Sequence, residues 1–277
     1  MPQKYLTIGG TATLVHHRGA TTLPGSPPKT EQGSTIVCLH EAGTNGGQFA
    51  DLMDHLAEKH SPIAFDQPGH GRSAGLDALP SIDAMVDQLR SLTEAWSIDH
   101  PVLVGEGLGS VVALQASVSD AGHPAALVLI GGTASASDLD SEIAALAAIT
   151  SGKARREFDR DGYAPETDKT VYQKAFGYWV KTDPRATLGA RRAQAAWSLN
   201  AAPAVPTMIV VGEHEDADAL AAAEALAQQL PNASVHRLDG AGRRGVLEQP
   251  AALAAAISAF IEANVTNNGS GSEQAAS

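Results

Sequence analysis

Residues 102–110, VLVGEGLGS, constrain the fold of this chain more than any other segment. The apolar run at its start predicts a buried strand, and glycines follow at alternate positions, Gly105, Gly107 and Gly109. Apolar residues resume in residues 111–118, which we expect to be helical. A strand that passes through a sharp turn into a helix is part of the unit from which parallel sheets are built. The segment therefore predicts an α/β protein.

The rest of the chain repeats this alternation. Further apolar runs predict buried strands at residues 34–40, 62–65, 126–132, 206–215 and 233–238. Helical patterns separate or follow them at residues 48–59, 82–96 (with Ser81 as its cap), 217–230 and 250–263. Residues 4–18 predict two short strands at a sheet edge, with His16 and His17 facing solvent. We therefore expect a mostly parallel sheet with helices on both faces.

The alternation stops between residues 134 and 200, a segment that is helical in pattern and mixed in charge. We expect one core, residues 1–133 and 201–264, carrying residues 134–200 as a helical cap over the carboxyl edge of the sheet. Residues 265–277 are too polar to bury a core and are expected to be disordered. Aromatic side chains gather in the cap, including Tyr178 and Trp179. They either line a ligand cavity or only hold the cap together.

Composition excludes several classes of protein. A net charge of −12 and a pI near 5.2 would repel phosphate backbones and anionic membranes, so neither nucleic acid nor membrane is an expected partner. The single cysteine, Cys38, excludes an internal disulfide and is expected to pack in its strand. The chain shows neither a signal sequence nor a membrane span, which predicts a cytoplasmic protein.

Four landmarks in order carry a resemblance to the α/β-hydrolase superfamily, in particular to small capped enol-lactonases and carboxylesterase-like enzymes. They are HEAG at 40–43, DQPGHGRS at 66–73, the glycine turn, and GEHE at 212–215 followed by GAGR at 240–243 and LEQP at 247–250. The resemblance covers residues 35–263. It implies a nucleophilic serine at Gly107, an acid at Glu215 and a histidine at Arg243.

Two of these three positions depart from the family pattern. Gly107 has no side chain to acylate, and Arg243 stays protonated, so it cannot act as a base. Ser110 lies one turn into the helix and is expected to point into packing or solvent. The resemblance also implies an oxyanion hole from the N–H groups of Leu108 and of the loop around Glu41, where relatives often have glycine.

Charged residues around the turn are the remaining candidates for chemistry. We predict catalytic roles for Glu106, Glu41, Arg243 and Glu215, and ligand binding by His40, Gly107, Leu108, Arg244, Tyr178 and Trp179. The carboxylates either react or form a structural ion-pair network with arginine. No metal or cofactor is expected, because the spacing of His40, Glu41 and Glu106 matches no metal motif and the glycines lack a full dinucleotide-binding signature.

These residues support two functions. The first is an enzyme that uses acid–base chemistry without serine, hydrolase-, lyase- or isomerase-like, on a small metabolite with a carbonyl or carboxylate group. The alternative is a catalytically inactive hydrolase homologue that binds a small ligand under the cap or regulates another process. A structural or partner-binding subunit is a weaker third possibility.

Overall fold

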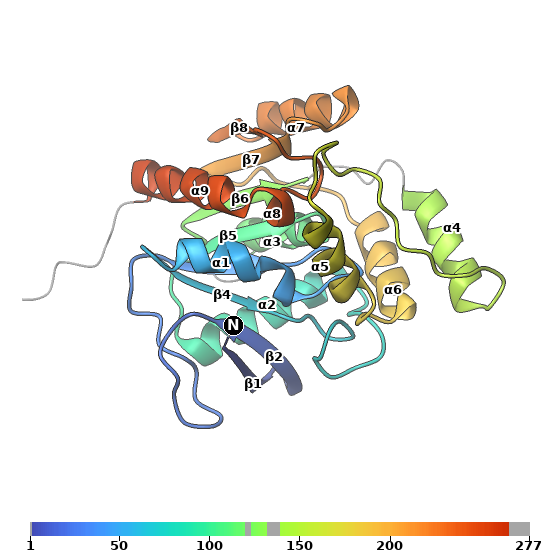
Figure 1. Cartoon of the computed structure of the whole chain (residues 1–277). Coiled ribbons are helices and arrows are strands. Elements are labelled where there is room, and N and C mark those ends of the chain that lie inside the picture. Colours follow the sequence, from blue (N-terminus) through green and yellow to red (C-terminus); the bar gives the residue numbers. More distant parts are fainter. Residues whose placement is uncertain (1, 120–122, 132–138, 266–277) are drawn as a thin grey trace, which may run out of the picture.

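The computed structural model describes residues 2–119, 123–131 and 139–265. Its centre is an eight-stranded sheet in the order β1-β2-β4-β3-β5-β6-β7-β8 (Figure 1). The strands are β1 (Gln3–Ile8), β2 (Thr11–His17), β3 (Thr35–Leu39), β4 (Ser61–Phe65), β5 (Val102–Glu106), β6 (Ala126–Ile130), β7 (Thr207–Gly212) and β8 (Ala233–Leu238). The tail predicted to be disordered lies, apart from Val265, outside the described residues.

The strands are parallel except at one edge. β1 pairs antiparallel with β2 and β2 pairs antiparallel with β4, while every pairing from β4 to β8 is parallel. The predicted α/β class with a mostly parallel sheet is therefore confirmed. Side chains alternate between the two faces along each strand: in β3, Ile36 and Cys38 pack on one side and Val37 and Leu39 on the other.

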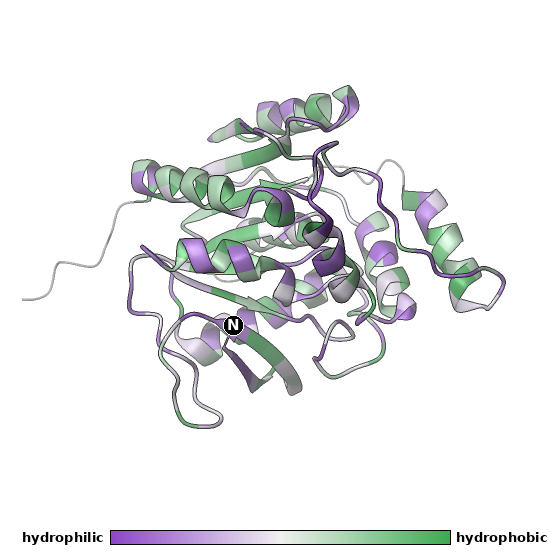
Figure 2. Ribbon diagram, in the orientation of Figure 1, coloured by the Kyte–Doolittle hydropathy of each residue, from purple (hydrophilic) through white to green (hydrophobic). Residues whose placement is uncertain are grey.

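Helices cover both faces of the sheet. One apolar cluster joins the strands to α1 (Ala50–Leu56) and α9 (Pro250–Asn264), and the other joins them to α2 (Ile82–Trp96), α3 (Leu108–Val118) and α7 (Ala217–Gln229). Hydrophobic residues concentrate on the central strands between these layers (Figure 2). As predicted, Ser81 caps α2, its hydroxyl accepting a hydrogen bond from Ala84 N at 3.1 Å.

Between β6 and β7, the residues that the structure describes form three helices and no strand. They are α4 (Leu139–Thr150), α5 (Lys169–Trp179) and α6 (Pro184–Ala195); in Figure 1, α4 and α6 lie to the right of the sheet and α5 lies between α6 and the core. We call residues 139–195 the helical insertion; residues 134–138 of the predicted cap lie outside the described residues. Helix α6 contacts α3, whereas α5 contacts the 3-10 turn η1 (Gly46–Phe49) and the short helix α8 (Gly245–Glu248). The insertion thus meets the core around the turn after β5.

The segment between α4 and α5 differs from the helical pattern predicted for it. Residues 155–160 form neither helix nor strand. Gly152 ends α4 with a positive φ of 74°, and Gly162 adopts a positive φ of 78°. Such backbone angles and the nearby Pro165 stop a helix from propagating, although the charge pattern between them suits one. Among the helices that the structure describes, none combines the length and apolarity required to cross a bilayer.

Candidate functional site

Gly107 forms the turn between β5 and α3. Its φ of 53° and ψ of −110° are rarely adopted by residues with a side chain, and its N–H donates to Ile130 O at 2.9 Å. The space above it is occupied as well, because a Cβ added to Gly107 would lie 1.2 Å from Glu41 Oε2. The backbone angles therefore favour glycine here, and the Glu41 carboxylate in its observed position leaves no room for a side chain.

The carboxylate of Glu41 lies over this turn. Its Oε2 accepts a hydrogen bond from Leu108 N at 2.9 Å, and its Oε1 accepts one from Ala42 N at 2.8 Å. These N–H groups belong to the two places where the sequence predicts an oxyanion hole. They do converge, but on a carboxylate of the same chain. Glu41 is only 5% exposed, so this carboxylate is buried over the turn.

Arg191 of α6 supplies the counter-charge for Glu41. Its Nη1 lies 2.5 Å from Glu41 Oε1, and its Nε donates to Glu142 Oε1 of α4 at 3.0 Å. Burial would lower the pKa of Arg191, but these two carboxylates raise it above its ordinary value. Sequence reasoning missed Arg191, because an arginine in a mixed-charge helix carries no signal that it pairs with a residue 150 positions away.

Glu106 is the second buried carboxyl group of the site, with 4% of its surface exposed. Its Oε2 accepts a hydrogen bond from Gln48 Nε2 at 2.7 Å, while its Oε1 has no hydrogen-bond partner among the described residues. Burial raises the pKa of Glu106 to about 7; the charges of Glu41 and Glu215 act in the same direction, and Arg244 and Gln48 oppose them. Glu106 therefore exchanges its proton near neutral pH.

A cavity of about 350 Å³ separates the core from the helical insertion. Arg191, Arg244, Gln48 and Tyr163 are among its polar lining residues. Its lining residues also include Ala145, Leu146, Ile149, Ala175, Trp179 and Leu247. Burial raises the pKa of Tyr163 to about 12, so its hydroxyl stays protonated at neutral pH. The cavity offers both charged groups and apolar surface to a small molecule.

The two aromatic residues predicted to bind ligand, Tyr178 and Trp179, both line this cavity. Trp179 also holds the insertion together: its ring lies 5.6 Å from that of Phe158, and the guanidinium carbon of Arg156 lies 3.9 Å above it. The two interpretations offered for the aromatic residues are therefore compatible.

Arg243 lies elsewhere than predicted. It is exposed and does not line the cavity, and its side chain runs along Gly162 while its N–H donates to Gly162 O at 2.6 Å. The following residue, Arg244, faces the cavity instead. Glu215 is half-buried and accepts a hydrogen bond from Gly212 N at 3.0 Å; burial raises its pKa, and Arg243 partly opposes this. Neither Glu215 nor Arg243 is among the residues that line the cavity.

His40, Gly107 and Leu108 are likewise absent from the cavity lining. His40 is fully buried, donates from Nδ1 to Glu41 O at 2.8 Å and accepts at Nε2 from Gln67 N at 3.0 Å. Burial lowers its pKa, which keeps the ring neutral. His40 therefore positions the Glu41 loop and has no free ring nitrogen for a ligand.

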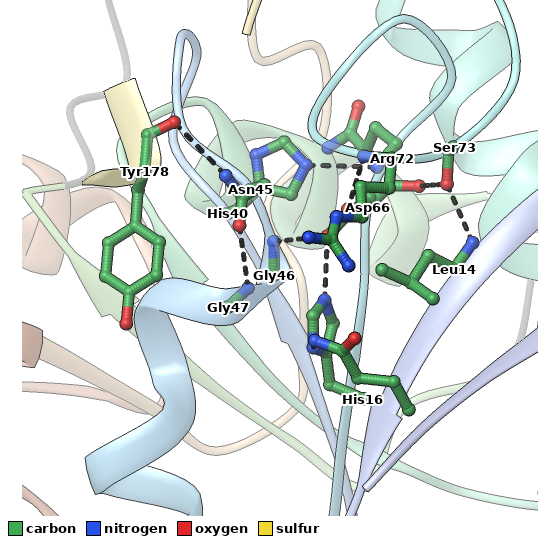
Figure 3. Close-up of polar contacts among 12 residues, drawn as sticks. Leu14, His16, His40, Asn45, Gly46, Gly47, Asp66, Arg72, Ser73 and Tyr178 are labelled. Atoms are coloured by element: carbon green, nitrogen blue, oxygen red, sulfur yellow. Dashed lines mark hydrogen bonds and ion pairs between the residues drawn. The ribbon is translucent and has the colours of Figure 1, made fainter. Parts of the chain in front are cut away.

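A buried network behind the site corrects another prediction. His16 and His17 are each only 2% exposed, because β2 lies between two strands and does not form the sheet edge. His16 Nε2 lies 2.8 Å from Asp66 Oδ1, which also accepts from Gly46 N at 2.9 Å (Figure 3). Burial favours the protonated acid, but the hydrogen bonds to Asp66, first of all from His16, hold its pKa below the ordinary value. The network fixes the turn η1 that carries Gln48.

Comparisons with known proteins agree with this architecture. A model of the alpha/beta hydrolase family matches residues 36–256, so the chain belongs to this family. The match confirms the resemblance predicted from the sequence. Polyketide synthase ThaQ of Burkholderia thailandensis is 26% identical over an alignment of 257 residues that takes in 83% of this chain. The chain spans only 12% of the length of that relative.

Two similar solved structures match almost their whole length. A thermophilic esterase from Thermogutta terrifontis (malate bound) has a TM-score of 0.79 and 17% sequence identity, covering 95% of this chain and 99% of its own. The enol-lactonase from Burkholderia xenovorans LB400 has a TM-score of 0.70 and 18% identity, covering 93% and 99%. At these identities the likeness establishes a common fold.

Proposed function

We propose that this chain is an enzyme of the alpha/beta hydrolase family that works without a nucleophilic serine, by acid–base chemistry on a small metabolite with a carbonyl or carboxylate group. The observation that carries the proposal is Glu106, a buried carboxyl group with one unpartnered oxygen and a pKa of about 7. A group with such a pKa gives and takes a proton at neutral pH, as a general acid or base must.

The residues around the turn support chemistry without serine. Gly107 carries no hydroxyl, and the hydroxyl of Ser110 is fully buried and donates to Gly105 O at 2.8 Å. The Cys38 thiol is fully buried, and burial raises its pKa, so it does not form a thiolate near neutral pH. None of these three residues offers a reactive nucleophile to the cavity.

In the proposed mechanism, Glu106 exchanges a proton with the bound metabolite, and Arg244 holds its anionic group. Glu106 does not itself line the cavity; Gln48, which donates to it, does. The mechanism therefore requires the Gln48 side chain to move aside when the ligand reaches Glu106. The helical insertion serves as a cap that shields the reaction from water. The similar structures are named as an esterase and an enol-lactonase, which favours a carbonyl-containing substrate for this chain too.

A second function, binding of a small ligand without catalysis, is favoured by Glu41. Its carboxylate fills the N–H pair that would stabilise an oxyanion during acyl transfer. A chain that only binds or senses a metabolite has no need of that pair. In this alternative the cavity and cap are retained and turnover is absent.

Turnover by matched variants separates these functions. We would screen enol-lactones, keto acids and p-nitrophenyl esters, and label the protein with a fluorophosphonate. Acid–base catalysis predicts no labelling, and a loss of about a hundredfold to ten-thousandfold in kcat for Glu106→Gln. Glu224→Gln, on the exposed side of α7, should leave turnover unchanged.

Other results would contradict the acid–base proposal. Fluorophosphonate labelling would show a reactive serine, and equal kcat for the wild type and Glu106→Gln would remove the proposed role of Glu106. Stabilisation by a metabolite without its turnover would favour the binding function; a ligand at a hundred times its dissociation constant adds about 2.7 kcal/mol to the free energy of unfolding.

A further inference from the structure

Three arginines line the cavity, and two of them already have partners. Arg191 lies between the carboxylates of Glu41 and Glu142, as described above. Arg156 stacks on the ring of Trp179 and donates from Nη2 to Trp179 O at 2.9 Å. Neither guanidinium is free to receive the charge of a ligand without breaking contacts that hold the insertion.

Arg244 is different. Within the described part of the chain, its guanidinium takes part in no ion pair and no hydrogen bond, and it faces the cavity from a half-buried position. Its backbone is held in place, because its N–H donates to Glu248 Oε2 at 3.2 Å. Burial would lower the pKa of Arg244, but the charges of Glu106 and Glu41 raise it above its ordinary value. A charged guanidinium that makes no ion pair or hydrogen bond of its own offers two parallel donors to a carboxylate.

The other anion-binding groups of the site are closed to a ligand. The N–H groups of Ala42 and Leu108 already bind Glu41, and a ligand that displaced this carboxylate would leave a buried charge without its partners. Negative charges also stand elsewhere at the cavity: Glu142 is paired with Arg191, and Glu157 and Asp159 are exposed. A second anionic group on a ligand would meet these carboxylates.

Apolar side chains form the rest of the wall, chiefly Leu146 and Ile149 of α4 and Trp179 of α5. We propose that the ligand of this cavity is a small apolar monocarboxylate, whose carboxylate pairs with Arg244 and whose apolar part packs against these side chains. The inference rests on the proposed function in taking this cavity as the ligand site. It also makes Glu41 a determinant of specificity, because its carboxylate occupies the N–H groups of Ala42 and Leu108 and leaves neither for the ligand.

Binding of matched small molecules to the whole chain tests the inference without requiring turnover. We would measure calorimetric affinities for phenylacetate and hexanoate, for the corresponding amides, and for succinate. We expect both monocarboxylates to bind, and the amides and succinate to bind about tenfold more weakly or worse, since the amides lose the charged partner of Arg244.

Variants assign the contact to Arg244. Arg244→Gln should weaken phenylacetate binding by about tenfold or more, whereas Arg192→Gln, an exposed arginine of α6, should leave it unchanged. Glu41→Gly should free the N–H pair and one of the two carboxylate contacts of Arg191, and this variant should gain affinity for succinate.

Three results would overturn the inference. They are equal affinities for phenylacetate and phenylacetamide in the wild type, phenylacetate binding that survives Arg244→Gln, and absence of binding by both monocarboxylates. The comparison of acid with amide uses the wild-type protein, so it decides the question even if a variant fails to fold. Failure of this inference can be distinguished from failure of the acid–base proposal. If only the acid–base proposal is wrong, the monocarboxylates still bind through Arg244, but Glu106→Gln has no effect on turnover.

Discussion

At the scale of single residues, Gly107 and Glu41 depend on each other. The Glu41 carboxylate occupies the space into which any side chain at position 107 would project. The chain keeps both the strained backbone of the turn and the N–H groups that follow it, but it uses them to bind an internal carboxylate. The two residues therefore act as one unit.

This dependence predicts a non-additive pair of substitutions. Gly107→Ala should cost about 2–5 kcal/mol in the free energy of unfolding, because its Cβ overlaps Glu41 and its φ is positive. Glu41→Ala should cost a similar amount, because Arg191 loses one of its two carboxylate partners and the N–H groups of Ala42 and Leu108 lose their acceptor. Urea unfolding of the double variant should show a loss smaller than the sum by about 1 kcal/mol or more. If the double variant lost as much stability as the two single variants together, the overlap between a side chain at position 107 and the Glu41 carboxylate would be contradicted.

Glu106 predicts how stability depends on pH. Its pKa is about 7 in the folded protein and near 4.5 when unfolded, so between these values the folded state binds one more proton. Stability should therefore fall as pH rises from about 4.5 to 7, by up to about 3 kcal/mol from this residue. Denaturant unfolding across this range should show a decline that Glu106→Gln removes and Glu224→Gln retains. If the free energy of unfolding changed with pH in the same way for the wild type and Glu106→Gln, the predicted contribution of Glu106 would be contradicted.

The sequence predicted this site only in part. Glu41 and Glu106 could be placed together because both flank parallel strands that end at one sheet edge. Arg244 could not be distinguished from Arg243 as the residue that faces the cavity, because an irregular loop has no period from which to infer side-chain direction. Arg191 required the tertiary fold, since a helix pattern does not say which distant residue it meets.

At the scale of secondary-structure elements, prediction succeeded where a periodic pattern and a cap agreed. The buried strands and α2 are examples, because continuous apolar runs and Ser81 leave few alternatives. It failed for residues 155–160, where charge spacing suited a helix that glycines at both ends prevent. It also failed for His16, since burial of β2 depends on where β1 pairs.

The short helix α8 carries Glu248, whose carboxylate binds both the helical insertion and a loop of the core. Glu248 Oε1 accepts hydrogen bonds from Ala164 N and Thr167 Oγ1, both at 2.6 Å, and its Oε2 accepts from the N–H groups of Gly242 and Arg244. The same side chain thus holds the irregular segment of the insertion and the loop that carries Arg244.

Replacement of Glu248 should therefore loosen both segments. We expect Glu248→Ala to cost about 2–4 kcal/mol in the free energy of unfolding, because several partly buried donors lose their acceptor. Limited proteolysis should also cut residues 155–168 faster. Glu262→Ala, which removes an exposed ion pair with Lys59, should leave the free energy of unfolding nearly unchanged. Equal stability of the two variants would contradict the proposed role of Glu248.

At the scale of the whole molecule, Arg191 joins the core to the insertion. It reaches from α6 to Glu41 of the core and to Glu142 of α4. Helix α4 has no buried residue and packs chiefly on α6, so few apolar contacts hold it in place. The closure of the cavity by α4 thus depends on the same arginine that neutralises Glu41. We therefore expect the binding of the Glu41 carboxylate to the N–H groups of Ala42 and Leu108 to be coupled to the position of α4.

Hydrogen exchange of an Arg191→Met variant tests this coupling. Methionine keeps much of the apolar stem but removes both ion pairs, so Glu142 loses its partner and local opening of α4 becomes easier. We expect the amides of residues 139–150 to exchange about tenfold faster, given the loss of the partly buried pair between Arg191 and Glu142. The amides of β5 should change less, and Arg192→Met should leave α4 unaffected. Unchanged exchange in α4 together with faster exchange in β5 would mean that Arg191 stabilises the core alone and that α4 is held by its apolar contacts with α6.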